Sequence, residues 1–291
     1  MKSNTKRILE AVQYIENNIR NDFTQDNIAQ NVYLSKSYLG SIFKALTGRN
    51  MMEYVRARKM AHIVHDLSHS SKKVMDIALD YGFSQEQNLI RAFKKSYNIT
   101  PAKFRNNQTE LPIQPKINNE MFVPIHNSIL IKPFFKFMPS IKFAGIEYVI
   151  GEYENIFYEN ATVYGNEFFY NQKHRIKGDF VKNIYYAYIR KTIENSNIYM
   201  PSVQLIGDAE VPDDMKVHTV PATNYAVFKY AGAHSPNEIG ANVLSGIHHY
   251  IFDIWMHTTK YTNDYKFHLE KIDQKSCREN YCEMDLYIPV N

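Results

Sequence analysis

The sequence predicts two domains, an all-α domain followed by an α+β domain. Its 291 residues are enough for two domains of ordinary size. Apolar residues recur at helical spacing through the first hundred positions, whereas short β-branched and aromatic segments alternate with helical ones later. A polar stretch containing two prolines, at 106–120, separates the two patterns. We therefore expect a helical domain at 1–107, a linker at 108–123 and an α+β domain at 124–291.

The charge divides at the same place as the periodicity. Residues 1–107 hold 17 Lys and Arg against 9 Asp and Glu, a net charge of +8, whereas residues 108–291 carry −4. A basic excess confined to one domain favours binding to a polyanion such as DNA. The acidic second domain is expected to have a function other than polyanion binding.

Composition narrows the protein class. Apolar residues make up 44% of the chain, enough for a buried core, and no apolar run approaches the roughly 18 residues of a membrane span. The N-terminal residues become amphipathic at once and show no signal-peptide core. Two Cys cannot form a disulfide framework. We expect a cytoplasmic protein without membrane contact.

The first domain has the pattern of two helix-turn-helix units joined by one longer helix. Thr24 and Ser35 are expected N-caps, and Gly48 is an expected helix end. Gly82 suits the positive-φ position of a tight turn. The expected helices are an opening one with the apolar stripe Ile8, Val12, Ile15 and Ile19, then 25–31, 35–47, 52–67, 74–80, 84–97 and a last one from Pro101.

The second helix of each unit is the one that would enter a major groove, so its outer face must offer donors to phosphates and base edges. Gln87 and Arg91 lie one turn apart and share a face, although Gln87 could instead close a capping box with Ser84. The candidate DNA contacts are Lys36, Ser37, Tyr38, Ser41 and Lys44 in the first unit and Gln85, Gln87, Asn88, Arg91, Lys94 and Lys95 in the second.

Residues 6–106 resemble the DNA-binding domain of AraC/XylS-type regulators. The second unit carries the block Ala78-Leu79-Asp80-Tyr81-Gly82-Phe83-Ser84, the first carries Ser35-Lys36-Ser37-Tyr38-Leu39, and Tyr54-Val55-Arg56-Ala57 belongs to the joining helix. The resemblance implies that one chain places two recognition helices in successive major grooves of a double-stranded promoter. We expect a transcription regulator with RNA polymerase as a further partner.

Two neighbouring positions depart from that pattern. Where the related branch of the family has bulky polar residues, this chain has Gly40 and Ser41. The first recognition helix is therefore expected to contribute less to base readout than the second.

The sequence of the second domain predicts a mixture of strands and helices. Segments 141–151, 222–230 and 284–290 have the composition of strands, and 157–173 and 238–256 that of helices. Its many aromatic side chains are expected to fill a core or to line a cleft. The candidates for a cleft are Tyr164, Phe168, Tyr185, Tyr186, Tyr188, Tyr225 and Tyr230.

The last strand shows a clear alternation. Met284, Leu286 and Ile288 point to one face, and Asp285 and Tyr287 to the other. An acid flanked by aromatic rings could hold a cationic ligand, whereas the alternative is that Asp285 simply faces water.

Residues 124–291 also resemble a GyrI-like effector-binding domain. The resemblance rests on Lys142-Phe143-Ala144-Gly145-Ile146, on 221–232, on Trp255 and on Leu286-Tyr287-Ile288-Pro289-Val290. It implies an α+β fold of duplicated βαββ halves around a cleft that takes a small-molecule effector. The family has Glu four residues before the closing Pro, used against cationic, lipophilic ligands, and this chain has Asp285 there. The resulting candidate ligand residues are Asp285, Tyr287, Trp255, Tyr164 and Phe168.

With the DNA-binding domain first, the domain order is similar to that of the Rob-type branch of AraC regulators. Two alternatives stay open for the second domain. Some GyrI-like domains hydrolyse small molecules with an acid and a Tyr, and a domain without a pocket would be a pure protein-interaction module.

Catalytic motifs are missing from the sequence. It contains no G-x-S-x-G, P-loop, G-x-G-x-x-G or H-E-x-x-H pattern. His248, His249 and His257 fall in one helical segment, and the last two could face the same way, but a metal site would normally use an i, i+4 pair with a third ligand. We expect no enzyme, no metal and no cofactor.

Overall fold

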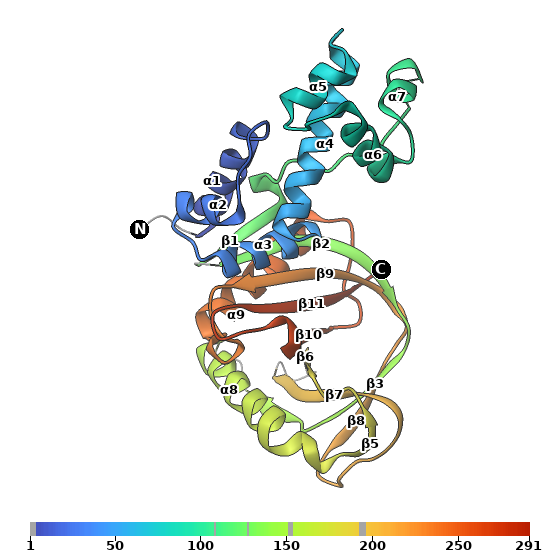
Figure 1. The fold of residues 1–291 in the computed structure, drawn as a ribbon. Coiled ribbons are helices and arrows are strands. Elements are labelled where there is room, and N and C mark those ends of the chain that lie inside the picture. Colours follow the sequence, from blue (N-terminus) through green and yellow to red (C-terminus); the bar gives the residue numbers. More distant parts are fainter. Residues whose placement is uncertain (1–3, 108, 127, 151–153, 192–195) are drawn as a thin grey trace. The chain divides into compact units, whose positions relative to one another are not determined.

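The computed structural model describes residues 4–107, 109–126, 128–150, 154–191 and 196–291. The chain forms two compact units, Met1–Met121 and Phe122–Asn291, whose elements are labelled in Figure 1. None of the described helices combines the length and apolarity that a membrane crossing requires.

The first unit is helical throughout, as predicted. The expected stripe of Ile8, Val12, Ile15 and Ile19 is buried, with at most 4% exposure. The long joining helix extends about one residue before and two beyond the predicted range. The elements are α1 (Asn4–Asn17), α2 (Gln25–Val32), α3 (Lys36–Thr47), α4 (Met51–His69), α5 (Val74–Asp80), α6 (Glu86–Tyr97), α7 (Pro101–Asn107) and the 3₁₀ turn η1 (Asn119–Met121).

Local capping explains where these helices begin and end. The Thr24 hydroxyl accepts the Asn27 N–H at 3.3 Å, and the Ser35 hydroxyl accepts the Tyr38 N–H at 3.2 Å. Gly48 ends α3 at φ 69°, and Gly82 makes the turn between α5 and α6 at φ 76°.

The start of α6 corrects one expectation. Gln85 is the N-cap, so Gln87 is the second helical residue and not the third. The capping box considered for Ser84 and Gln87 is therefore wrong, and Gln87 remains available on the surface of α6.

A largely buried carboxylate connects α1 to the joining helix α4. Glu16 accepts hydrogen bonds from Arg58 Nε at 2.7 Å and Nη2 at 2.8 Å, and its other close neighbour is His62 Nε2 at 2.8 Å. Burial alone would raise the pKa of Glu16, but the bonds with Arg58 and His62 outweigh it and lower the pKa to about 2.

The segment after α7 is held on the same unit. Arg58 Nη1 donates to the carbonyl oxygen of Gln114 at 2.7 Å, and the Ile117 N–H donates to the Tyr54 hydroxyl at 3.2 Å. The Ile117 side chain is only 1% exposed. Part of the stretch expected as a linker therefore packs against α4.

The second unit consists of a sheet with helices, as predicted. Its strands are β1 (Phe122–Ile125), β2 (Ser128–Met138), β3 (Ile141–Gly145), β4 (Tyr148–Ile150), β5 (Lys177–Phe180), β6 (Ile184–Lys191), β7 (Asn197–Glu210), β8 (Lys216–Val220), β9 (Thr223–Gly232), β10 (Phe267–Asp273) and β11 (Cys282–Val290). Its helices are α8 (Glu154–Glu167), α9 (Ala241–His248) and α10 (Met256–Thr258), with π-helical turns η2 (Phe168–Gln172) and η5 (His249–Trp255) and 3₁₀ turns η3 (Lys173–Arg175), η4 (Pro236–Glu238) and η6 (Gln274–Ser276).

The strand order contains the predicted duplication. The order is β1-β2-β9-β11-β10-β6-β7-β3-β8, antiparallel at every pairing, with β4 and β5 added on β7. The chain runs β3–α8–β6–β7 and then β9–α9–β10–β11, and in each half the first strand lies beside the last. The two βαββ halves meet where β6 pairs with β10, which confirms the predicted fold class.

Both halves place their helix on the same face of the sheet (Figure 1). Alternation along β6 shows the two faces clearly. Tyr185, Ala187 and Ile189 join the core beneath α8 and α9, whereas Tyr186 joins a second core on the opposite face.

Several boundaries differ from the sequence prediction. The single strand expected at 141–151 is divided into β3 and β4, and its last residue, Gly151, lies outside the described residues. The two expected helices, 157–173 and 238–256, begin as α-helices and continue as π-helical turns. The strands β6, β7 and β10, which carry the centre of the sheet, were not predicted.

The Glu16 contacts predict a pH-dependent contribution to stability. Because the pKa is lower in the folded chain than the usual 4.5, the stabilisation is complete above pH 4.5 and is lost as the pH falls toward 2. We expect Glu16→Gln to lower the free energy of unfolding by about 2 kcal/mol at pH 7 and by almost nothing near pH 2. Urea unfolding of both full-length chains, followed by helical circular dichroism at several pH values, measures this. A constant difference across that pH range would contradict it.

Candidate functional site

The surface of α3 carries only part of the predicted DNA-binding set. Lys36, Ser37 and Lys44 are exposed. Tyr38 and Ser41 are buried, at 4% and 7% exposure, so their predicted position on the outer face is wrong. They lie on the same side of the helix as the core residues Leu39, Ile42 and Leu46.

The α6 surface presents the second predicted set. Gln85, Gln87, Arg91, Lys94 and Lys95 are all exposed, and Leu89 and Phe93 face the core at 0% exposure. Asn88 is half-buried and donates to the Ser84 hydroxyl at 3.2 Å.

One of the cationic side chains of α6, Arg91, is held in place by a neighbouring residue. Arg91 Nη2 donates to the Asn88 side-chain oxygen at 3.1 Å, which holds the guanidinium along the exposed face. Two lysines at the C-terminal end of α6 extend the positive charge along the helix. This arrangement offers a fork of donors and two point charges to an anionic partner.

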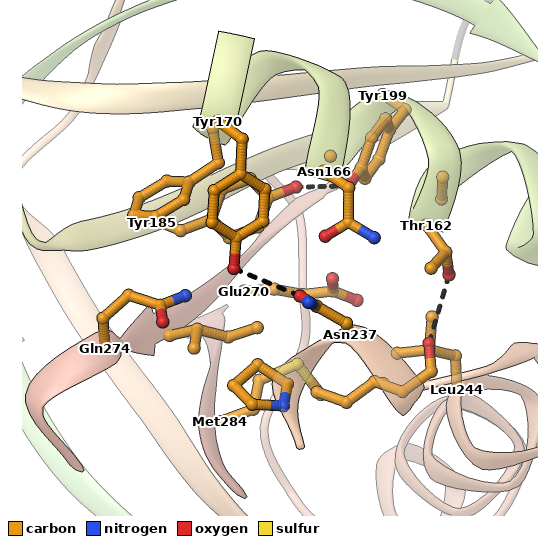
Figure 2. Close-up of a pocket in the computed structure, with 16 residues that line it drawn as sticks. Thr162, Asn166, Tyr170, Tyr185, Tyr199, Asn237, Leu244, Glu270, Gln274 and Met284 are labelled. Atoms are coloured by element: carbon orange, nitrogen blue, oxygen red, sulfur yellow. Dashed lines mark hydrogen bonds between the residues drawn. The ribbon is translucent and has the colours of Figure 1, made fainter. Parts of the chain in front are cut away.

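A pocket lies in the second unit where its two halves meet beneath the helices (Figure 2). Its side chains leave a cavity of about 60 Å³ that is partly open to solvent, smaller than a typical small-molecule site, so an organic ligand requires the lining side chains to move apart. The lining residues are Ala161, Thr162, Gly165, Asn166, Phe169, Tyr170, Tyr185, Tyr199, Pro236, Asn237, Ile239, Leu244, Glu270, Ile272, Gln274 and Met284.

Two buried tyrosines form one wall of the pocket. The hydroxyl groups of Tyr185 and Tyr199 are hydrogen-bonded to each other, as Figure 2 shows. Burial raises the pKa of each phenol, and the negative charge of Glu270 raises it further, so both stay protonated. A Cβ at Gly165 would stand 2.8 Å from both hydroxyl oxygens, so α8 can approach the pair only with glycine at this position.

Polar contacts between lining residues join α8 and η2 to the segment that precedes α9. The Tyr170 hydroxyl donates to the Asn237 side-chain oxygen at 3.2 Å, and the Thr162 hydroxyl donates to the Ile239 carbonyl at 3.1 Å. The first of these contacts is exposed to solvent, so it can open without the loss of buried packing.

Glu270 supplies the charge of the pocket. It is only 6% exposed, and Figure 2 shows its carboxylate among the lining side chains. His248 Nε2 lies 3.2 Å from the carboxylate and His268 Nε2 lies 4.0 Å from it. Burial, together with the neighbouring His248, lowers the pKa of His268 well below 6.5, so that this ring is neutral at pH 7.

The register of β10 against β11 decides which acid reaches the pocket. Glu270 is paired with Leu286, and Lys271 with Asp285, and paired residues of neighbouring strands share a face. The predicted alternation of β11 is confirmed, since Met284, Leu286 and Ile288 all belong to the core beneath the helices. The pocket lies on that face, however, so Asp285 points away from it.

Asp285 has partners of its own on the opposite face. Its carboxylate accepts a hydrogen bond from Lys229 Nζ at 2.7 Å, and Lys271 Nζ lies 3.9 Å away. Asp285 is therefore an ion-paired acid outside this pocket, and its assignment as a ligand residue stays a prediction.

None of the other four predicted ligand residues lines the pocket either. Tyr287 is buried in the core of the opposite face. Trp255 packs edge-on against Phe228, with ring centroids 5.0 Å apart, and Tyr164 stacks on Tyr148 at 3.9 Å. Phe168 is buried in a third cluster at 0% exposure. Each aromatic ring is used for packing, whereas Tyr185, from the wider set of cleft candidates, does line the pocket.

The sequence held a weak signal for Glu270. His268 and Glu270 alternate with Phe267 and Leu269, so two ionisable groups share one face of a strand. A strand with apolar residues on one face and ionisable residues on the other is usually half-exposed, and here both faces are buried.

Two family models match the chain. A helix-turn-helix domain model matches residues 28–107. A model described as "Integron-associated effector binding protein" matches residues 136–290, more than half of the chain.

Curated relatives match the first unit. "Probable transcription factor PqrA" of Proteus vulgaris is 44% identical over 84 residues, which are 29% of this chain and 69% of PqrA. "Transcriptional regulator Rob" of Salmonella typhimurium is 30% identical over 128 residues, 43% of this chain and 44% of Rob, so the match spans less than half of that relative. "Multiple antibiotic resistance protein MarA" of Escherichia coli strain K12 is 32% identical over 32% of this chain and 74% of MarA.

Among solved structures, SAV2435 bound to tetraphenylphosphonium covers 55% of this chain and 94% of its own, at 13% identity and a TM-score of 0.41.

The organised face of α6 predicts unequal contributions to DNA binding. We expect Arg91→Ala to weaken binding to the preferred DNA site by about 1–3 kcal/mol and to relax its sequence preference. Ser41→Ala should have a smaller effect because Ser41 is buried. The control is Lys177→Ala, which removes one exposed charge from the second unit. Fluorescence anisotropy with a selected duplex and a scrambled one gives both quantities. A greater loss for Ser41→Ala would assign the readout to α3.

Proposed function

Because the chain belongs to the AraC/XylS family of DNA-binding transcription regulators and carries an effector-binding domain of the integron-associated family, we propose that its pocket binds a small organic cation that regulates its action on DNA. The observation that carries this proposal is the nearly buried carboxylate of Glu270 inside an aromatic and aliphatic pocket.

The pocket chemistry favours a cation over other ligands. Glu270 is the one acid among the described lining residues, which include no Lys or Arg. Charge attraction is strong where water is excluded, and the faces of aromatic rings also attract cations. Phe169, Tyr170 and the Tyr185–Tyr199 pair supply rings around the carboxylate. A flat or compact cation with an apolar body matches this combination.

The first unit supplies the DNA-binding end of the regulator. The helix α4 has 19 residues, a length of about 28 Å at 1.5 Å per residue, and joins the two helix-turn-helix units. This length suits two recognition helices, α3 and α6, placed in successive major grooves about 34 Å apart. The exposed cations of both helices are the proposed phosphate and base contacts.

An effector changes DNA binding or recruitment only if it binds two states of the chain with different affinity. The exposed contact between the lining residues Tyr170 and Asn237 is one place where two such states can differ. RNA polymerase is the further partner that we propose for the chain when bound at a promoter, and joint binding on a promoter fragment tests it.

The two alternatives for the second domain receive less support. A pure interaction module was expected to have a closed aromatic core, whereas the described residues enclose a pocket that opens to solvent. A hydrolase would need an activated nucleophile. The hydroxyls of Tyr185 and Tyr199 are the reverse of activated, because burial raises their pKa values.

The charge of Glu270 predicts a selective loss of cation binding. Glu270→Gln keeps the shape of the side chain, and we expect it to weaken binding of phenyltrimethylammonium by about 2–4 kcal/mol, the Coulomb attraction between unit charges roughly 4–8 Å apart at an effective dielectric constant of about 20. The uncharged analogue tert-butylbenzene should lose much less. Isothermal titration calorimetry on the full chain measures both ligands.

Asp285→Asn is the matched control, since it removes a carboxylate from the same sheet on the face away from the pocket. It should leave the affinity of phenyltrimethylammonium unchanged within about twofold. A larger loss for Asp285→Asn than for Glu270→Gln would return the ligand site to the opposite face of the sheet.

A further inference from the structure

Three side chains with metal-binding atoms meet next to the pocket. His248 comes from the end of α9, and His268 and Glu270 from alternate positions of β10. One ligand atom of each lies within 4.8 Å of the other two. His248 Nε2 and His268 Nε2 are 3.2 Å and 4.0 Å from the same Glu270 oxygen.

His268 Nε2 has no hydrogen-bond partner among the described residues, although His268 is only 8% exposed. A buried polar atom without a partner is unfavourable, because it has lost its hydrogen bond to water and gained none in return. Such an atom indicates a further bound partner that does not belong to the chain. The nitrogen belongs to the cluster that contains the Glu270 carboxylate, so the missing partner fits between the two.

We infer that His248, His268 and Glu270 form a site for Zn²⁺. Two imidazole nitrogens and one carboxylate oxygen are a ligand set that zinc takes with a fourth position left open. Magnesium and calcium prefer oxygen ligands throughout and fit this donor set poorly.

The present separations require only a modest contraction. Zinc–nitrogen and zinc–oxygen bonds of roughly 2.0–2.2 Å place the donors of a tetrahedral site about 3.3–3.5 Å apart. One pair in the cluster already lies at 3.2 Å, the second lies at 4.0 Å and the third is no more than 4.8 Å apart. Rotation of the two rings and of the carboxylate can supply shifts of this size.

The site also has a route for entry. Glu270 lines the pocket, so an ion that enters the pocket reaches the carboxylate first. A bound Zn²⁺ would change the charge contributed there from −1 for the carboxylate to +1 for the complex. Zinc and an organic cation would therefore compete. The inference itself needs only the three ligands and does not depend on the effector proposed for the pocket.

The test is metal binding by the full chain after removal of metals with a chelator. We expect one equivalent of Zn²⁺ to bind, measured by competition with a fluorescent zinc indicator. Co²⁺ should bind at the same place and give the visible absorption of a low-coordinate cobalt site, which Zn²⁺ then abolishes. Stoichiometric binding together with this spectrum supports the inference.

Variants separate the proposed ligands from other histidines. His268→Gln and His248→Gln should each weaken Zn²⁺ binding at least 30-fold, while His249→Ala, which changes an exposed neighbour paired with Asp253, should change it less than threefold. Far-UV circular dichroism in the presence of chelator checks that each variant folds. Because the two substitutions lie on different elements, a misfolded His268→Gln leaves His248→Gln as the test.

The results also separate this inference from the proposed effector site. Loss of zinc binding in His268→Gln with phenyltrimethylammonium binding retained supports the metal site independently. Zinc binding that survives in both His248→Gln and His268→Gln, or no binding by the unmodified chain, overturns it, whatever the organic cation does.

Discussion

The antiparallel register between β10 and β11 sets the chemistry of the second domain. It pairs Glu270 with Leu286 and Lys271 with Asp285, and so places one acid on the helix-covered face and the other on the opposite face. A slip of one residue would exchange the two faces of β10 and put Lys271 where Glu270 stands. The sign of the charge in the pocket thus depends on strand pairing as much as on residue type.

The pairing of β10 with β6 supplies the walls around that charge. Glu270 of β10 is paired with Ala187 of β6, which is a small residue. Tyr185 precedes Ala187 by two positions in β6 and therefore lies on the same face. Tyr185 then reaches the hydroxyl of Tyr199 on β7. The meeting line of the two βαββ halves therefore brings an acid, a small residue and a tyrosine pair together. Each half alone would contain only part of this pocket.

Burial strengthens the attraction of the Glu270 carboxylate for a positively charged ligand. A nearly buried carboxylate is unfavourable by several kcal/mol unless neighbouring groups compensate it. Within the described chain, His248 Nε2 at 3.2 Å is a close polar neighbour, and His268 is held neutral by its own burial. Such a group attracts a positive ligand more strongly than an exposed acid does, because little water screens it. The same reasoning applies to an organic cation and to a metal ion.

The first domain could be predicted from sequence in detail because its signals are local. Thr24, Ser35, Gly48 and Gly82 each act on the backbone within a few residues, so cap and turn preferences were sufficient. The same reasoning failed for Tyr38. A tyrosine on an amphipathic helix can face either way, and only packing against the other helices decides.

The pocket could not be predicted because its residues are brought together by long-range pairing. The alternation of β11 was predicted correctly, but alternation alone does not tell which face carries the helices. Asp285 was therefore placed in the cleft. Glu270 was missed because the strand β10 itself was not predicted, and its partner His248 belongs to a helix 22 residues earlier.

The segment that precedes β1 offers a physical route between ligand and DNA. Gln114 is bound through its carbonyl by Arg58, and Ile117 is bound through its N–H by Tyr54, both on α4. Arg58 also holds Glu16 of α1, so one guanidinium ties the segment and the first helix to the same joining helix. The second domain starts at Phe122, only five residues after Ile117. A change of state that pulls on this segment from Phe122 would therefore act first on the Ile117–Tyr54 bond and next on the Gln114–Arg58 bond, and through Arg58 on the position of α1 against α4. Coupling along the chain requires no direct contact between pocket and DNA, only two arrangements of this segment that the effector binds unequally.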